Sequence, residues 1–310
     1  MPISFAKERF SSRHLGLSDS EKAEMLQFCG ASSLEELINQ TVPPAIRMQR
    51  DLNIPEALSE REFLESFRAL AKKNQVFTSF IGMGYYDTVT PNVIQRNILE
   101  NPGWYTAYTP YQAEIAQGRL EALINFQTAV TDLTGMDLAN ASLLDEGTAA
   151  AEAMTMMHAT RSKKTKKKAN RILVDALCHP QTIELLETRA EPLDIHVDIK
   201  STSSFDVHAE DVFAIIVSYP NTEGAVSDYT DLFTAATESD VRNIVVADLL
   251  SLTLLKAPGE MGADVVVGSS QRFGVPMGYG GPHAAFFATK EEFKRNIPGR
   301  IIGVTVNREG

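Results

Sequence analysis

The stretch Asn243-Ile-Val-Val-Ala-Asp248 is a short, continuous apolar run that ends in a carboxylate. Similar runs occur at Arg171-Ile-Leu-Val-Asp175, Val212-Phe-Ala-Ile-Ile-Val-Ser218, Ala263-Asp-Val-Val-Val-Gly268 and Ala284-Ala-Phe-Phe-Ala288. Such runs are typical of strands covered on both faces of a parallel sheet. Helical segments are expected between them, for example over 181–189 and 228–239. This alternation predicts a doubly wound α/β domain, in which ligands bind outside the carboxyl ends of the strands.

Composition limits the class of protein. The 310 residues include 29 Lys+Arg and 40 Asp+Glu, a formal net charge of −11, and 44% are hydrophobic, which excludes a disordered or fibrous chain. The acidic total argues against nucleic acid or a membrane surface as the main partner. We interpret the basic run Arg161-Ser-Lys-Lys-Thr-Lys-Lys-Lys168 as a solvated loop between a helix and a strand.

Cysteine content and hydropathy indicate the compartment. Cys29 and Cys178 are too few and too far apart for a disulfide framework or a metal site, so they are expected to be idle thiols in a reducing compartment. No segment approaches the ~20 apolar residues of a membrane span, and no signal or transit peptide is visible. We therefore expect a cytoplasmic protein without a metal.

The first part of the chain, residues 1–75, is predicted to be a helical segment, followed by a large α/β domain over 76–310. Capping boxes, in which a hydroxyl and a carboxylate satisfy free backbone N–H groups at a helix start, are expected at three places. These are Ser18-Asp-Ser-Glu21, Ser33-Leu-Glu-Glu36 and Ser59-Glu-Arg-Glu62. The apolar face of these helices must pack on something.

The segment that follows is rich in glycine and aromatic residues. Phe80-Ile-Gly-Met-Gly-Tyr-Tyr-Asp87 lacks the third glycine of a dinucleotide site. Tyr105-Thr-Ala-Tyr-Thr-Pro-Tyr-Gln-Ala-Glu114 leads into a strong helix whose apolar residues recur with a 3.6-residue period. Such a density of polar-tipped rings marks either a ligand site or ordinary packing at a domain edge.

Several residues follow predicted strands and are candidates for a ligand site. Gly147 and Thr148 begin a helix, where small residues favour an anion or a close helix–sheet contact. His179 either stacks on a planar ligand or has a structural role. Asp248 either holds a protonated ring nitrogen or caps the next turn. The glycines of 268–283 permit close backbone approach. This order of features resembles pyridoxal-phosphate enzymes of the aspartate-aminotransferase fold, in which a lysine after the second strand forms the Schiff base.

More specific strings identify a closer resemblance, which covers essentially the whole chain. The chain is similar to the N-terminal half of the glycine cleavage system P-protein family, which in some bacteria is a separate subunit. The matching strings are Arg13-His-Leu-Gly16, Ser33-Leu-Glu-Glu-Leu-Ile38, Thr41-Val-Pro43, Ile46-Arg47, Phe80-Ile-Gly-Met-Gly-Tyr-Tyr86, residues 105–114, Gln117-Gly-Arg-Leu-Glu121, Asn125-Phe-Gln127, Leu133-Thr-Gly135, Pro276-Met-Gly-Tyr-Gly-Gly-Pro-His283 and Pro298-Gly-Arg-Ile-Ile-Gly-Val304.

The resemblance implies that only the C-terminal half of the family carries the Schiff-base lysine. In this chain the equivalent string reads Ser270-Gln-Arg-Phe273, which places Gln271 or Arg272 at the lysine position, depending on the direction of counting. Neither side chain forms an internal aldimine, because a guanidinium stays protonated and an amide is not a nucleophile. We therefore expect no covalent pyridoxal phosphate on this chain, with Gly147, Thr148, His179, Asp248, Gln271 and Arg272 as vestiges of a cofactor site.

The resemblance also implies a reaction and partners. The full enzyme decarboxylates glycine with pyridoxal phosphate and passes the aminomethyl group to the lipoyl arm of H-protein, and this half supports the active site of the lysine-bearing half or subunit. Candidates for the wall of the glycine site, which needs hydroxyl and amide donors, are Tyr85, Tyr86, Tyr105, Tyr108, Tyr111, Gln112 and Glu114.

Alternative interpretations stay open at this point. This half is either part of the active site or a purely structural module for pairing with the lysine-bearing half. A third interpretation, a stand-alone pyridoxal enzyme, lacks a lysine at 270–272. The chain also stops at Arg308-Glu-Gly310, where the fold would continue into a C-terminal small domain, so that domain is expected to be missing.

Overall fold

The computed structural model describes residues 10–278 and 283–306, and the chain divides into two compact units, Met1–Thr78 and Ser79–Gly310. Two predicted features, part of the glycine-rich loop (residues 279–282) and the chain end at 307–310, lie outside the described residues. None of the helices in the described ranges is long and apolar enough to cross a membrane.

The first unit contains short helices: α1 (Phe10–His14), α2 (Asp19–Phe28), α3 (Leu34–Thr41) and α4 (Glu60–Ala71). The capping boxes of α2 and α4 are confirmed. The hydroxyl oxygens of Ser18 and Ser59 each accept from the backbone N–H of the third helical residue, and the Glu side chain at that position accepts from the backbone N–H of the serine. The third box is half formed, since Ser33 caps α3 but Glu36 accepts from Ser32 instead. Helices α2, α3 and α4 bury none of their residues.

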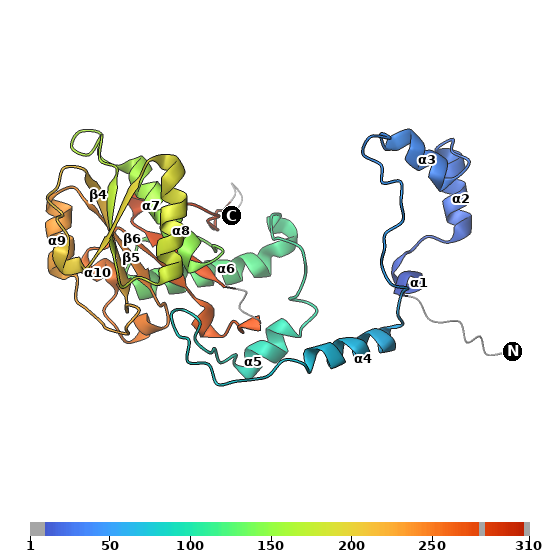
Figure 1. Ribbon diagram of the computed structural model, residues 1–310, viewed down its shortest axis with the longest axis horizontal. Coiled ribbons are helices and arrows are strands. Elements are labelled where there is room, and N and C mark those ends of the chain that lie inside the picture. The colour runs from blue at the N-terminus through green and yellow to red at the C-terminus, as the bar shows by residue number, and fades with distance from the viewer. Residues whose placement is uncertain (1–9, 279–282, 307–310) are drawn as a thin grey trace. The chain divides into compact units, whose positions relative to one another are not determined.

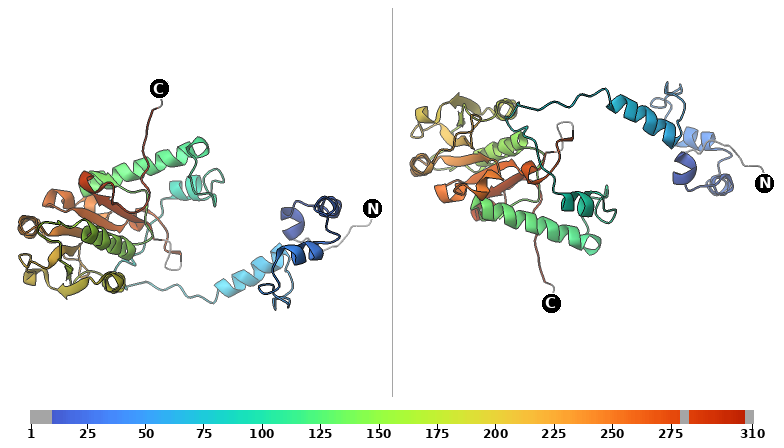
Figure 2. Two further views of the ribbon diagram at one scale, coloured as in Figure 1. Left: turned by 90° about the horizontal axis from the view of Figure 1, so that it is seen from above. Right: turned by 90° about the horizontal axis from the view of Figure 1, so that it is seen from below.

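The second unit is built on a seven-stranded mixed sheet with the order β1-β7-β6-β5-β4-β2-β3 (Figures 1 and 2). Neighbouring pairs from β3 to β6 are parallel, whereas β7 is antiparallel to both β6 and β1. The strands are β1 (Leu138–Ala139), β2 (Arg171–Asp175), β3 (His196–Lys200), β4 (Val212–Tyr219), β5 (Arg242–Ala247), β6 (Val265–Ser269) and β7 (Ala285–Thr289). All five strands predicted from apolar runs are confirmed.

Two hydrophobic cores form because successive residues of a strand face opposite sides of the sheet. Ile172 and Val174 join one core, while Leu173 between them joins the other. The first core includes residues of α7 (Glu146–Thr160) and α8 (Pro180–Ala190), and the second includes residues of α6 (Ala113–Thr134), α9 (Thr230–Glu238) and α10 (Pro258–Met261). Figures 1 and 2 show helices on both faces of the sheet. The continuous apolar runs are explained by this burial on both faces.

The remaining short elements connect these layers. They are α5 (Asn92–Ile94), a π-helix (Gln95–Leu99), and 3₁₀ turns at Glu191–Leu193, Thr202–Ser204, Ser251–Thr253, Gln271–Phe273 and Glu291–Phe293. The long helix predicted after Glu114 is α6, and Ala116 and Val130 of its predicted apolar face are buried.

The basic run is a connection between α7 and β2, as predicted, but it is not solvated throughout. Lys166 is buried, and its Nζ donates to the carbonyl oxygen of Ala209 at 3.1 Å. The other lysines of the run are exposed. The burial of Lys166 does not follow from the charge of the run, because the lysine binds a carbonyl group that is distant in sequence and its aliphatic stem is buried.

Candidate functional site

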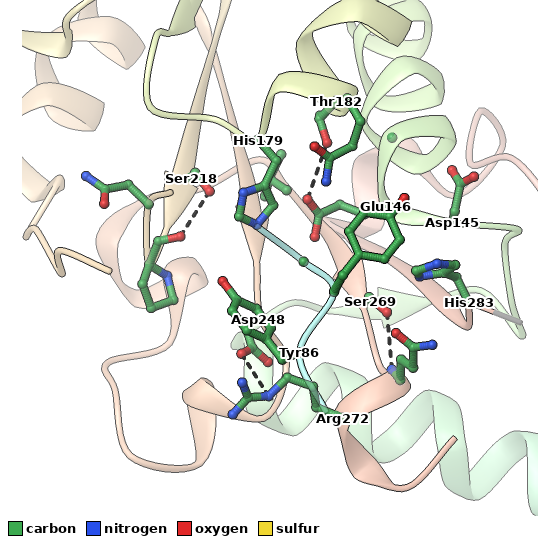
Figure 3. A pocket seen from close by; sticks show the side chains of 18 of the residues that line it. Tyr86, Asp145, Glu146, His179, Thr182, Ser218, Asp248, Ser269, Arg272 and His283 are labelled. Atoms are coloured by element: carbon green, nitrogen blue, oxygen red, sulfur yellow. Dashed lines mark hydrogen bonds and ion pairs between the residues drawn. The ribbon is translucent and has the colours of Figure 1, made fainter. Parts of the chain in front are cut away.

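A cavity of about 580 Å³ lies at the carboxyl ends of the central strands (Figure 3). Each side of it comes from a different connection: the glycine loop before α5, the start of α7, the turn after β2, and the segments after β5 and β6. The residues that line it and bear on its chemistry are Gly84, Tyr85, Tyr86, Asp145, Glu146, Gly147, His179, Gln181, Thr182, Asp248, Ser269, Gln271, Arg272 and His283. This is the position predicted for a ligand site in an α/β sheet.

The carboxylate of Asp248 is already engaged within the chain. Its Oδ2 lies 3.3 Å from Nε of Arg272, and its Oδ1 accepts from the backbone N–H of Leu250 at 3.0 Å. The guanidinium of Arg272 also stacks on the ring of Tyr86, 5.1 Å from the ring centroid. Asp248, the candidate partner for a protonated ring nitrogen, is therefore already paired with Arg272.

The start of α7 brings two more carboxylates to the cavity. Asp145 caps the helix, because its Oδ1 accepts from the backbone N–H of Thr148 at 2.7 Å. Glu146 follows at the first helical position, and its Oε1 accepts from Oγ1 of Thr182 at 3.3 Å. The pKa of Glu146 is raised to about 7, chiefly by burial; the Thr182 hydrogen bond opposes the shift, and the nearby charges of Asp248 and Asp145 add to it.

Gly147 is explained by packing. A Cβ at this position would lie 3.1 Å from Cδ2 of Leu185 on α8, which is tighter than ordinary van der Waals contact. The structure therefore favours the close helix contact over the anion site, since a phosphate at this helix start would meet the carboxylates of Asp145 and Glu146. Thr148 belongs to the helix cap and does not line the cavity.

His179 forms part of the wall and has 8% of its surface exposed. Its Nδ1 lies 3.0 Å from Oγ1 of Thr222, and burial lowers its pKa, with Asp248 acting in the opposite direction. Gly84 passes directly over this ring with φ of +87°, and a Cβ there would lie 3.5 Å from Cδ2 of His179. Because Nε2 of Gln181 donates to the carbonyl oxygen of Met83 at 2.7 Å, the glycine loop is held at the cavity.

The cavity does not fit covalently bound pyridoxal phosphate. Of the described residues that line it, none is a lysine. Of the two predicted lysine positions, Gln271 is 2% exposed and carries an amide, while Arg272 pairs with Asp248. The helix start that would receive a phosphate carries two carboxylates.

The structure divides the predicted wall residues into two groups. Tyr85 and Tyr86 line the cavity together with Gly147, His179, Asp248, Gln271 and Arg272. The second group does not line it and is exposed at the surface, with Tyr105 at 60% and Tyr111 at 72%. This group consists of Tyr105, Tyr108, Tyr111, Gln112 and Glu114.

Two arginines hold the exposed tyrosine segment at its ends. Nη2 of Arg119 donates to the carbonyl oxygens of Gly103 and Trp104 at 3.2 and 2.9 Å. At the other end, Nη2 of Arg300 donates to the carbonyl oxygen of Tyr111 at 3.4 Å, and its guanidinium lies 5.1 Å from the centroid of that ring. The segment is therefore fixed although its side chains face solvent.

Sequence reasoning missed the acidic character of the cavity. Asp145, Glu146 and Thr182 are not among the residues that the sequence singles out. The available signal was a pair of carboxylates at a helix start that follows a short apolar segment. Asp248 comes about a hundred residues after Asp145 and Glu146 in the sequence, so only the folded sheet brings the three acids together.

Comparison with known proteins gives a consistent result. Residues 12–310 match the family model of the glycine cleavage system P-protein. Glycine dehydrogenase (decarboxylating) of Synechocystis is 56% identical over 303 residues, covering 98% of this chain and 30% of that protein. The Agrobacterium fabrum protein of the same name is 57% identical over 309 residues, covering 100% of this chain and 31% of that protein. The chain thus spans about a third of the length of these relatives.

A solved structure is also similar. The crystal structure of glycine decarboxylase (P-protein) of the glycine cleavage system, in inhibitor-bound form, matches with a TM-score of 0.86 and 36% identity. The match covers 95% of this chain and 67% of that one. It confirms the predicted fold class, an α/β domain with a mixed sheet covered by helices.

Proposed function

Because the chain belongs to the glycine cleavage system P-protein family and corresponds to its N-terminal part, we propose that it is the lysine-free half of a glycine-decarboxylating enzyme. In this proposal the assembled enzyme decarboxylates glycine and passes the aminomethyl group to the lipoyl arm of H-protein, in the bacterial cytoplasm. Pyridoxal phosphate is held by the lysine-bearing half, and this chain completes the substrate site.

The ion pair between Asp248 and Arg272 carries the proposal. It places a permanent cation against the acid at the end of β5, and the adjacent Gln271 is not a nucleophile. Among the described residues that line the cavity, a cofactor that needs a lysine finds none, and the carboxylate of Asp248 is already paired with Arg272. The cofactor therefore belongs to the other half of the assembly.

Exposed apolar side chains support a partner that covers part of the second unit. Phe80 is 92% exposed and Val89 is 83% exposed, and Tyr111 and Ile115 also face solvent. A protein surface of this kind marks an interaction site. We assign it to the lysine-bearing half, because the related proteins are about three times as long as this chain.

The tyrosine segment is the proposed contribution to the glycine site. Its hydroxyl groups, with the amide of Gln112, are suitable donors for the carboxylate of glycine, and its rings supply the apolar wall that strips water from that carboxylate. The two arginine anchors support this role over a purely structural one, because they hold the segment in place while Tyr105 and Tyr111 stay exposed; the hydroxyl of Tyr108 accepts from the backbone N–H of Gln112 at 3.1 Å.

A titration with pyridoxal phosphate tests the location of the cofactor. The purified chain is mixed with pyridoxal phosphate, its absorbance is followed, and the mixture is reduced with borohydride for mass analysis. We expect no adduct on a specific lysine. A stoichiometric adduct on one lysine would overturn the proposal and favour a stand-alone pyridoxal enzyme.

Conservative substitutions test the role of the tyrosine segment. In the enzyme assembled with the lysine-bearing half, Tyr108→Phe and Glu114→Gln are expected to reduce glycine decarboxylation while leaving assembly unchanged, as measured by size-exclusion chromatography. Thr188→Val, on the exposed side of α8, is the matched control. Full turnover in both tyrosine-segment variants would favour the structural-module alternative.

A further inference from the structure

The cavity carries an unbalanced negative charge. Asp145, Glu146 and Asp248 line it, while Arg272 is the single permanent cation among the described lining residues and is paired with Asp248. His179 does not offset this charge, because burial lowers its pKa and favours the neutral ring. The permanent cation Arg272 thus pairs with Asp248 and not with the two carboxylates at the start of α7.

Polar atoms in the cavity are available for a ligand. Glu146 uses Oε1 to accept from Thr182, and no hydrogen bond of the described chain engages Oε2. His179 is more than nine-tenths buried and uses Nδ1 toward Thr222, while Nε2 has no hydrogen-bond partner among the described residues. Figure 3 shows Glu146, His179 and Asp248 around the same space.

We propose that this cavity is a non-covalent binding site for a small molecule that carries a protonated primary amine, held by the carboxylates of Glu146 and Asp145 beside the tyrosine rings. The site is distinct in role from the glycine site proposed for the assembled enzyme. None of the described residues that line it is a lysine that could hold pyridoxal phosphate, but its volume is of a size usual for small-molecule sites.

The chemistry of the wall selects a cation. An ammonium group donates three hydrogen bonds and is attracted by carboxylates and by the faces of aromatic rings; Tyr85 lines the cavity, whereas the ring of Tyr86 already holds the guanidinium of Arg272. A carboxylate or phosphate ligand would instead face Asp145 and Glu146. No group of three metal-binding side chains occurs in the described ranges, so the acids are not arranged to chelate a metal ion.

Proton release is a further consequence of amine binding. The titratable and charged groups around Glu146 are the helix cap Asp145, Cys178 and His179 after β2, Asp248 with its partner Arg272, and the lining residues Tyr85, Tyr86 and His283, while Thr182 on α8 donates to it. With the pKa of Glu146 at about 7, a bound cation favours the ionised carboxylate, and binding at pH 7 is expected to release roughly half a proton.

Calorimetric titration of the 310-residue chain with ethanolamine tests the proposal, with acetate and glycine in parallel experiments. Saturable binding of ethanolamine and no binding of acetate are expected, with proton release at pH 7 measured from two buffers of different ionisation enthalpy. Binding of glycine comparable to ethanolamine supports an amine-directed site that tolerates a carboxylate. Absence of saturable ethanolamine binding, or equal binding of acetate, overturns the proposal.

Variants localise the binding site. Glu146→Gln retains the acceptor for Thr182 and is expected to weaken ethanolamine binding at least tenfold. Asp145→Asn keeps a helix-capping side chain, removes the second charge and is expected to weaken binding several-fold, which tests the site if the first variant does not fold. Glu152→Gln, on the same helix but paired with Arg189 outside the cavity, is the control. Equal affinity in the Glu146 and Glu152 variants overturns the proposal without bearing on the cofactor test above.

Discussion

Replacing Glu146 by Gln is expected to stabilise the protein above pH 7 and to have little effect near pH 4.5. Folding raises the pKa of this carboxyl group from an ordinary value of 4.5 to about 7, chiefly through burial. The folded state therefore binds more protons than the unfolded state between these values, so stability decreases as pH rises through this window. The difference of about 2.5 pKa units corresponds to an upper limit of about 3 kcal/mol.

The measurement is the free energy of unfolding by urea, followed by circular dichroism at pH 4.5, 6 and 8. The advantage of Glu146→Gln over the wild type is expected to grow from near zero at pH 4.5 to at most about 3 kcal/mol at pH 8. The neutral amide keeps the acceptor for Thr182, so the change isolates the charge. Glu152→Gln, outside the cavity, is the control for a general effect of removing one acid. An advantage that is the same at all three pH values would refute the reasoning.

Two further predictions concern the sheet and its buried ion pair. Gly268→Ala is expected to destabilise the fold by about 3 kcal/mol or more, because the added Cβ would lie 1.8 Å from the carbonyl oxygen of Ala247 on the adjacent strand, and thermal unfolding followed by circular dichroism measures the loss. Lys290→Met is expected to cost about 1 to 2 kcal/mol in urea unfolding, because Nζ lies 2.6 Å from Oδ1 of the buried Asp264, whereas Nη1 of Arg242 remains 3.6 Å from the same oxygen. Lys294→Met, which removes an exposed lysine nearby, is expected to change stability by less than about 1 kcal/mol, and a similar loss in both lysine variants would contradict the argument.

The central strands were predictable because each is buried on both faces, which leaves a continuous apolar run in the sequence. Strand β3, His196–Lys200, was not predicted, since it lies at the sheet edge and alternates polar with apolar residues. Strand β1 is two residues long and too short to produce a pattern. Local periodicity thus detects the centre of the sheet better than its margins.

The candidate site was predictable in part. Residues placed directly after apolar runs, such as His179 and Asp248, were expected at the carboxyl edge of the sheet and line the cavity there. The pairing of Arg272 with Asp248 was not expected, because it depends on how the turn after β6 directs a long side chain toward β5. The same holds for the raised pKa of Glu146, which results from burial.

The sequence by itself determined the α/β class, the burial of the central strands and the absence of a lysine at the Schiff-base position, because each depends on residue type and order along the chain. The tertiary structure alone decided that three carboxylates share one cavity. It also decided that Tyr85 and Tyr86 line this cavity, whereas the tyrosine segment lies outside it and is exposed. These are properties of distance and exposure between residues far apart in sequence. They are set by strand order and loop path, which no local pattern encodes.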